Sequence, residues 1–374
     1  MKTYTLSNIF NFSGINLLII FSAFLGEEKL AADMAIIIGC SFFFTQLLSS
    51  NSRNILIINY NDKEYFQKIF LRIKLSLPIY LLINTFNYIY FKEISYVSLL
   101  ISLIIVLQWI NELYLLKIFQ KKNNSKLNLY LSINILFYFL ILASYLFERI
   151  YSSNLYLIFF ALFNLFFLIT GIIKNNYNEY NYEVSLFTIF SKDLSNFSFY
   201  SSFSMVFINF ISRIIILEFL SKDLSGILFA CISLGSIPGS MFNNSFGPYL
   251  IKNKINIFSK KYFFVFLFLF VISLFIILDQ NQLIKNFFKF DTFKFDTLYL
   301  CYLGSFFMVI ALYFRQYLLF RNKSNLHKIF VIDVVNSLIY LFIILSVCFI
   351  NLQVFFSFIF LIFSIFNFFI FSIY

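Results

Sequence analysis

Long apolar runs separated by short polar turns fill the chain from end to end. Each run has about 18 or more residues, which is enough for an α-helix to cross a hydrocarbon core about 30 Å thick. The run from Tyr262 to Leu278 is apolar on all sides, whereas the strands of a membrane barrel alternate apolar and polar residues. A helix also satisfies its own backbone hydrogen bonds in lipid. The pattern therefore predicts an all-α integral membrane protein.

We expect about twelve transmembrane helices, six on each side of a polar stretch. The expected spans are residues 8–25, 31–49, 73–91, 95–116, 128–147 and 153–173, then 197–219, 225–247, 262–279, 298–319, 329–350 and 353–373. Residues 174–196, which begin KNNYNEYNYEV, are predicted to be a cytoplasmic linker. Residues 1–173 are thus expected to form an N-terminal six-helix lobe, and residues 197–374 a C-terminal six-helix lobe.

The two halves also resemble each other in order and direction. Residues 28–57 can be aligned with residues 222–251, a shift of 194 positions, so that each segment has a charged outer turn, an apolar span and a polar inner end. The second and eighth spans cross in the same direction. The expected repeat is therefore parallel, giving two six-helix bundles related by an axis along the membrane normal.

The basic residues are distributed unequally between the two sides of the membrane. The composition is 61% hydrophobic and 12% charged with a net charge of +11, while ordinary globular chains have about one quarter charged residues. One set of loops holds 20 of the 28 Lys and Arg, the other set holds seven, and Arg213 lies within a span. Because basic loops stay in the cytoplasm, we expect an inner-membrane protein with both termini cytoplasmic. The charge fits contact with anionic membrane lipids, and no nucleic-acid partner is expected.

Several kinds of catalytic site have no counterpart in the sequence. The chain contains one histidine, four cysteines without C-x-x-C spacing, and no GxxxxGK[ST] phosphate loop. No metal, no cofactor and no catalytic residue is therefore predicted. The longest outer loop, about residues 280–297, contains no Arg or His, which argues against an extracytoplasmic active site. We do not expect an enzyme.

Two arginines are candidates for binding an anionic substrate. Arg213 lies inside the seventh span, in INFISRIIILEF, and Arg53 lies at the inner end of the second span. A guanidinium stays charged and matches the oxygens of a phosphate with its planar fork. The alternatives are an ion pair or a surface-reaching side chain for Arg213, and an ordinary cytoplasmic anchor for Arg53.

Three carboxylates near the membrane could bind a coupling proton or cation, namely Asp33, Glu112 and Asp333. Ionisable residues at membrane depth are functional candidates by default. Asp33 and Glu112 lie near span ends, which also fits solvated positions. Asp333 is separated from Arg315 by a short loop, which also fits a structural ion pair.

The eighth span is interrupted in its middle by SLGSIPGS. Gly235, Pro238 and Gly239 predict a bend or hinge there, because proline removes a backbone donor and clashes with the preceding turn. Asn243 and Asn244 follow and give the span a polar inner half that could line a substrate cavity. Transporters use broken helices at their binding sites.

These features resemble the multidrug/oligosaccharidyl-lipid/polysaccharide (MOP) flippase superfamily, and within it the O-antigen and polysaccharide flippases of the Wzx type. The resemblance rests on Asn209 to Leu250, with Arg213, SLGSIPGS and NNSFGPYL, and on FFFTQLLSSNSRNILI in the first half. It implies a MATE-like fold and the translocation of an undecaprenyl-diphosphate-linked oligosaccharide, for O-antigen or lipopolysaccharide assembly, by alternating access. It also implies a polysaccharide polymerase and a chain-length regulator as partners. By the resemblance Arg213 and Arg53 would bind the diphosphate or acidic sugars.

Two other functions remain open from the sequence. One is a membrane polysaccharide polymerase or glycosyltransferase, which would need charged residues in outer loops. The other is a small-molecule exporter of the same superfamily, which would change drug sensitivity without changing the surface glycan.

Overall fold

The computed structural model is helical throughout the part of the chain that it describes. That part comprises residues 7, 11, 14–49, 56, 61–93, 95–121, 123–146, 150–173, 197–242, 292–321, 326–350 and 353–373. Eight of the described helices are long and apolar enough to cross a membrane, and two shorter apolar stretches, Ser125–Ile141 and Leu155–Gly171, lie within two more helices. The prediction of a multi-pass helical membrane protein is confirmed. The number twelve stays a prediction, because the ninth expected span, 262–279, lies outside the described residues.

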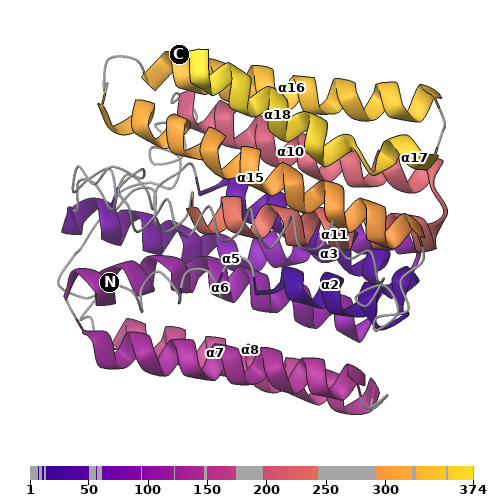
Figure 1. Cartoon of the computed structure of the whole chain (residues 1–374). Coiled ribbons are helices and arrows are strands. Elements are labelled where there is room, and N and C mark those ends of the chain that lie inside the picture. Colours follow the sequence, from indigo (N-terminus) through magenta and orange to yellow (C-terminus); the bar gives the residue numbers. More distant parts are fainter. Residues whose placement is uncertain are drawn as a thin grey trace. The chain divides into compact units, whose positions relative to one another are not determined.

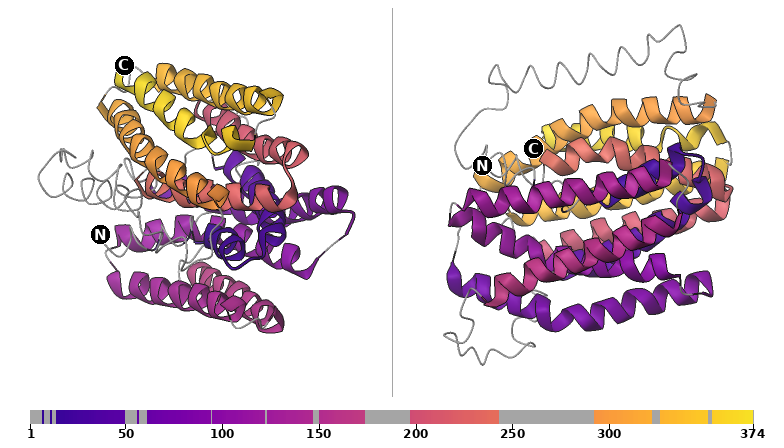
Figure 2. Two further views of the ribbon diagram at one scale, coloured as in Figure 1. Left: turned by 45° about the vertical axis from the view of Figure 1, so that its right-hand side comes forward. Right: turned by 90° about the horizontal axis from the view of Figure 1, so that it is seen from below.

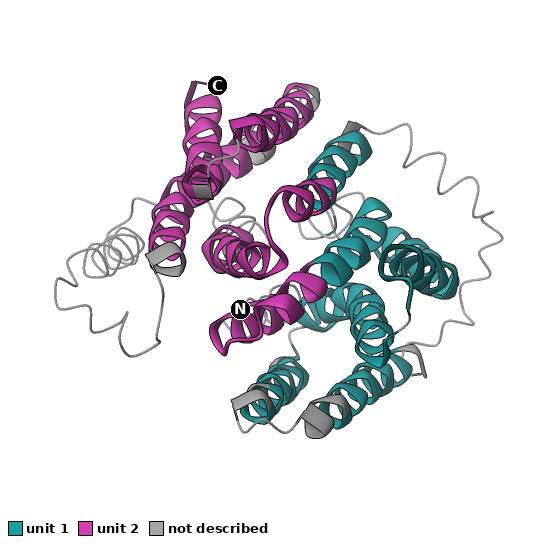
Figure 3. Cartoon of the chain, turned by 90° about the vertical axis from the view of Figure 1, so that its right-hand side faces the viewer, with its two compact units in different colours: residues 1–15, 36–210 teal, residues 16–35, 211–374 magenta. Residues whose placement is uncertain are grey.

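The chain divides into two compact units that are interleaved along the sequence (Figure 3). Unit 1 contains residues 1–15 and 36–210, and unit 2 contains residues 16–35 and 211–374. Residues 16–35, from the first half of the chain, thus belong to the same unit as most of the second half. The expected lobes, 1–173 and 197–374, and the repeat between them are defined by chain order and stay predictions. The expected linker lies outside the described residues.

Unit 1 is built around one deeply buried helix. This helix, α6 (Tyr96–Gln120), packs against α5 (Asp62–Phe91), α7 (Asn124–Leu146) and α8 (Ile150–Ile173), and these helices run alongside one another (Figures 1 and 2). The helix α5 begins at its N-cap Asn61, whose side chain accepts a hydrogen bond from the backbone N–H of Lys63. Its polar first turns lie before the expected span, so the helix starts well before residue 73.

The core of unit 1 contains a neutral polar cluster. The Tyr130 hydroxyl donates to Oδ1 of Asn11 at 2.6 Å, and the amide of Asn111 donates to the Asn164 side chain at 3.3 Å. Asn11 also donates to the backbone carbonyl of Gln108. These side chains are buried, and hydrogen bonds of this kind join helices in membrane proteins.

Unit 2 is centred on α15 (Thr292–Arg321). This helix packs against α11 (Lys222–Met241), α16 (Leu326–Ile350) and α18 (Ile359–Ile373). The short helix α2 (Asn16–Phe24), from the first half of the chain, packs against α11. A turn separates α18 from the four-residue helix α17 (Gln353–Phe356), so the last expected span is not one continuous helix. Two helices cross from one unit to the other, α3 (Glu28–Leu47) and α10 (Phe197–Phe219).

Large apolar side chains cover the outer faces of several helices. Phe166 on α8 and Phe342 and Phe349 on α16 are 66%, 71% and 85% exposed. Soluble monomers rarely expose contiguous apolar surface on this scale. The exposed faces are therefore those expected of helices surrounded by lipid.

Candidate functional site

Arg213 holds the backbone of another helix. It lies within α10, six residues before the helix ends at Phe219. Its guanidinium donates from Nη1 to the backbone carbonyl of Ala35 on α3, and both residues belong to unit 2. Among the described residues no carboxylate forms an ion pair with Arg213. The carbonyl accepts a hydrogen bond without neutralising the positive charge.

Polar groups accompany Arg213 on α10 and on the neighbouring helix α16. The phenol of Tyr340 on α16 lies beside Ser212 and Arg213. Ser202 and Asn209 fall on the same side of α10 as Arg213, because residues four and seven positions apart share a helix face. Asn209 is exposed, and Ser202 and Arg213 are partly exposed. α10 also carries further serines and Glu218, so polar residues are not confined to the side that holds Arg213.

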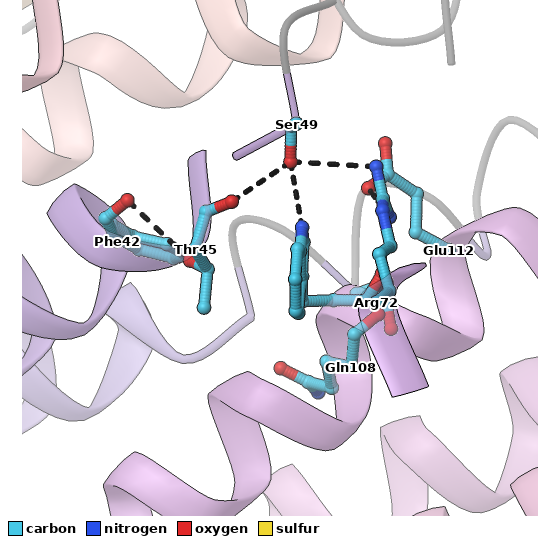
Figure 4. A network of polar contacts seen from close by, with 8 residues as sticks. Phe42, Thr45, Ser49, Arg72, Gln108 and Glu112 are labelled. Atoms are coloured by element: carbon cyan, nitrogen blue, oxygen red, sulfur yellow. Dashed lines mark hydrogen bonds and ion pairs between the residues drawn. The ribbon is translucent and has the colours of Figure 1, made fainter. Parts of the chain in front are cut away.

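Arg72 forms a buried ion pair in unit 1 (Figure 4). Its Nη1 lies 2.8 Å from Oε2 of Glu112, joining α5 to α6, and the two side chains are 2% and 4% exposed. The same nitrogen donates to the backbone carbonyl of Trp109. The alternative of a solvated position for Glu112 is therefore wrong. Its carboxylate is buried and compensated by a guanidinium.

Ser49 ties the end of α3 to this ion pair (Figure 4). Its hydroxyl accepts from Nη2 of Arg72 at 3.4 Å and from the Trp109 indole at 2.7 Å, and it donates to the backbone carbonyl of Thr45 at 3.0 Å. The guanidinium also lies 5.1 Å from the centre of the Trp109 ring, within cation–π range. Arg72 is thus held by two residues of α6 and by Ser49, just after α3, which fits a structural role.

A second buried ion pair lies in unit 2. Arg315 on α15 donates from Nε and Nη2 to the two carboxylate oxygens of Asp333 on α16, each at 2.7 Å. Both side chains are almost completely buried. The structure thus shows the ion pair with Arg315 that was the alternative to an ion-coupling role for Asp333. Because a fork-like pair of this kind occupies both oxygens, it favours a structural role, and ion coupling by Asp333 and Glu112 stays an untested prediction.

Asp33 joins the two halves of the chain within unit 2. Its carboxylate lies 2.7 Å from Nζ of Lys222, the first residue of α11. The side chains of Asp33 and Lys222 are 29% and 46% exposed. A partly solvated position is thus confirmed for Asp33, and its carboxylate has a cationic partner there.

The segment expected to act as a hinge in the eighth span is part of a continuous helix. α11 continues through Gly235, Pro238 and Gly239 to Met241. A Cβ added at Gly235 would lie 2.6 Å from the backbone carbonyl of Cys301, so this glycine permits a close approach to α15. A hinge function of the three residues stays a prediction. Three other predicted site residues, Arg53, Asn243 and Asn244, lie outside the described residues.

Three contributions to these sites were not predicted from the sequence. Arg72 comes just before the expected span 73–91, and Lys222 comes between the expected spans 197–219 and 225–247, so both were expected in loops. Ala35 contributes its backbone carbonyl, which the residue type does not reveal. A signal for Arg72 did exist, because Asn61 is an N-capping residue and the turn that follows it, from Asp62, is acidic like the first turn of a helix. The partner of Arg213 could not be found in this way, because it is a backbone carbonyl 178 residues away.

The comparisons with known proteins identify the fold. No protein-family model and no curated protein matches the sequence. Two solved structures are similar over 99% of this chain and 94% of theirs, each at 13% sequence identity. One is a MATE in complex with MaD3S, with a TM-score of 0.53, and the other is a MOP superfamily transporter from Pyrococcus furiosus, with a TM-score of 0.56. The chain is therefore a multi-pass membrane protein with the fold of the MATE and MOP superfamily transporters.

Proposed function

We propose that the protein is a flippase that moves an undecaprenyl-diphosphate-linked oligosaccharide from the cytoplasmic to the periplasmic leaflet of the bacterial inner membrane. It is a transporter and carries out no covalent chemistry. The observation that carries the proposal is the charge of Arg213, which no carboxylate among the described residues compensates. An isolated charge at membrane depth is costly, and an anionic substrate group would offset that cost.

The chemistry of Arg213 suits a diphosphate. A guanidinium presents five donors in a plane and can bind two oxygens at once. Nη1 is already engaged with a neutral carbonyl, and an anionic oxygen is the stronger acceptor. Ser202 and Asn209, on the same side of α10, supply hydroxyl and amide groups that can bind sugar hydroxyls.

The other predicted substrate ligands complete the proposal. Arg53 would meet the diphosphate at the inner leaflet, and Asn243 and Asn244 would line the path from the eighth span. The partners proposed for the product are a polysaccharide polymerase and a chain-length regulator. Both termini are proposed to be cytoplasmic, because the side with 20 basic residues then faces inward.

A small-molecule exporter is the second candidate function. It is favoured by the fold itself, because one similar structure is a MATE in complex with MaD3S. The two functions differ in their cargo. If the protein is an exporter, its loss should change drug sensitivity and leave lipid-linked glycan unchanged.

The test is a deletion strain examined for unflipped lipid-linked glycan. We expect completed undecaprenyl-diphosphate-linked units to accumulate on the cytoplasmic face, and the wild-type chain to relieve the accumulation. Arg213→Met should fail to relieve it although the variant inserts normally, and Arg213→Lys should relieve it in part, because lysine keeps the charge and loses the fork. Absence of accumulation in the deletion strain, with altered drug sensitivity, would establish the exporter instead. Accumulation of single units on the outer face would point to a polymerase.

A further inference from the structure

Residues 28–35 of α3 and residues 222–226 of α11 meet within unit 2, and we name this contact the α3–α11 joint. Gly226 makes the approach close. A Cβ added there would lie 1.9 Å from the backbone oxygen of Glu28 and 3.3 Å from the backbone nitrogen of Ala32. Small residues allow such close helix crossings in membranes. At the joint only glycine fits at position 226 without a backbone shift.

The joint brings together positions that correspond in the predicted repeat. The alignment that relates residues 28–57 to residues 222–251 pairs Ala32 with Gly226, and these two residues lie against each other. The joint thus connects a segment from the first half of the chain with one from the second half, at the end of the helices that the sequence predicts to face outward.

The joint contains an exposed ion pair and has an apolar contact beside it. Asp33 and Lys222 form a partly exposed ion pair with 2.7 Å between Oδ1 and Nζ, and such pairs are weak. Next to the joint, Phe24 on α2 packs against a small cluster that contains Ile227 and Cys231 of α11. Neither contact includes a buried charge pair, in contrast to Arg72 with Glu112.

Arg213 connects the candidate substrate site to this joint. Its acceptor, the carbonyl of Ala35, lies two residues after Asp33 on the same helix. A phosphate oxygen that binds at Nη1 competes with this carbonyl, because the charged acceptor forms the stronger hydrogen bond. The bond from Arg213 fixes the end of residues 28–35 to α10, which is followed directly by α11. Loss of this bond frees Ala35 from α10.

We propose that the α3–α11 joint is a latch that an anionic diphosphate releases through Arg213. This inference rests on the proposed function and adds how the substrate acts on the fold. A ligand shifts a conformational equilibrium only by binding one state more tightly. Here the diphosphate binds more tightly when Arg213 is not engaged with Ala35. By reciprocity, loosening the joint increases affinity for the diphosphate by the same factor.

The test uses the full chain in phosphatidylethanolamine and phosphatidylglycerol vesicles. Cysteines replace the ion pair in the double variant Asp33→Cys/Lys222→Cys, and a short bismaleimide bridges them. The four native cysteines are buried, and each single variant is the control for background reaction. Undecaprenyl diphosphate is the probe, and undecaprenol, which has the same tail and no charge, is the matched lipid control.

We expect efficient cross-linking without added lipid, a fall of about fivefold with undecaprenyl diphosphate, and no change with undecaprenol. With Arg213→Met added, undecaprenyl diphosphate should have no effect. The proposal is overturned if the diphosphate leaves cross-linking unchanged, if it acts equally in the Arg213→Met background, or if the pair does not cross-link without lipid.

A second variant tests the reciprocal effect without altering the ion pair. Gly226→Ala should separate the joint and tighten the binding of undecaprenyl diphosphate by about fivefold. Gly304→Ala is its control, because a Cβ there would meet the Phe360 ring at 2.8 Å in the contact between α15 and α18. Equal effects of the two variants would contradict the latch. The two proposals can fail separately. Normal glycan translocation by Arg213→Met would contradict the proposed flippase site, whereas cross-linking that does not change with undecaprenyl diphosphate would contradict the latch.

Discussion

Arg72 and Arg213 both contact other helices, but of the two only Arg72 has a carboxylate partner within the part of the chain that the structure describes. Arg72 lies 2.8 Å from the buried Glu112 and also contacts Ser49 and Trp109. Arg213 donates to the backbone carbonyl of Ala35, and no carboxylate among the described residues pairs with it. Arg315, bonded twice to Asp333, resembles Arg72. The difference favours a structural role for the two compensated arginines, whereas under the proposed function Arg213 binds an anionic group of the substrate.

The largest expected effect comes from breaking the pair in unit 1. Glu112→Gln leaves the Arg72 charge buried without its counter-ion and should lower the free energy of unfolding by about 3–5 kcal/mol. Thermal unfolding of the purified variant in detergent measures the loss. The double variant Arg72→Met/Glu112→Leu removes both charges and should be much closer to the wild type. A single variant as stable as the double variant would show that Arg72 is not compensated by Glu112.

Arg213→Met should reduce glycan translocation and leave the stability of the protein nearly unchanged. Losing hydrogen bonds between a charged donor and the diphosphate corresponds to about 1.5–3 kcal/mol, so the rate of glycan translocation should fall by about one to two orders of magnitude. Its unfolding temperature should change little, because only one bond to a neutral carbonyl is lost. If the variant instead unfolds like Glu112→Gln, Arg213 belongs with the structural arginines.

A substitution in the neutral polar cluster of unit 1 should have a smaller effect than the substitutions that test the two arginines. Tyr130→Phe removes the hydrogen bond to Asn11 and should lower the unfolding free energy by about 0.6 kcal/mol, and at most by about 1.7 kcal/mol. Chemical unfolding in mixed micelles gives this value. A loss as large as that of Glu112→Gln would mean that neutral polar contacts stabilise unit 1 as strongly as its ion pair.

Lys222→Ala should have the smallest effect on stability. The pair with Asp33 is partly exposed, and pairs of this kind contribute about 0.2–1 kcal/mol. Salt should weaken the pair in the wild type and have little further effect in the variant. A loss of several kcal/mol would show that the pair is as strongly coupled as the buried pairs.

The eight described helices that could cross a membrane were predictable because each contains a local run of apolar residues. The length of α5 was not, because its first turns are polar and the sequence pattern marks only the lipid-facing part of a helix. The Arg315–Asp333 pair could be anticipated because 18 residues and one short loop separate the partners. Arg72 and Glu112 are 40 residues apart, and Arg213 and Ala35 are 178 apart. No local pattern encodes such distant partners, because they depend on how the helices pack.

The measurement that tests the central claim most directly is glycan translocation by purified protein in vesicles that contain undecaprenyl-diphosphate-linked oligosaccharide. Wild-type protein, Arg213→Met, Arg213→Lys and Arg72→Met/Glu112→Leu would be compared at equal amounts of folded protein. We predict translocation by the wild type and by the unit 1 double variant, reduced translocation by Arg213→Lys, and nearly none by Arg213→Met. Wild-type rates from folded Arg213→Met would contradict the assignment of Arg213 as the diphosphate ligand.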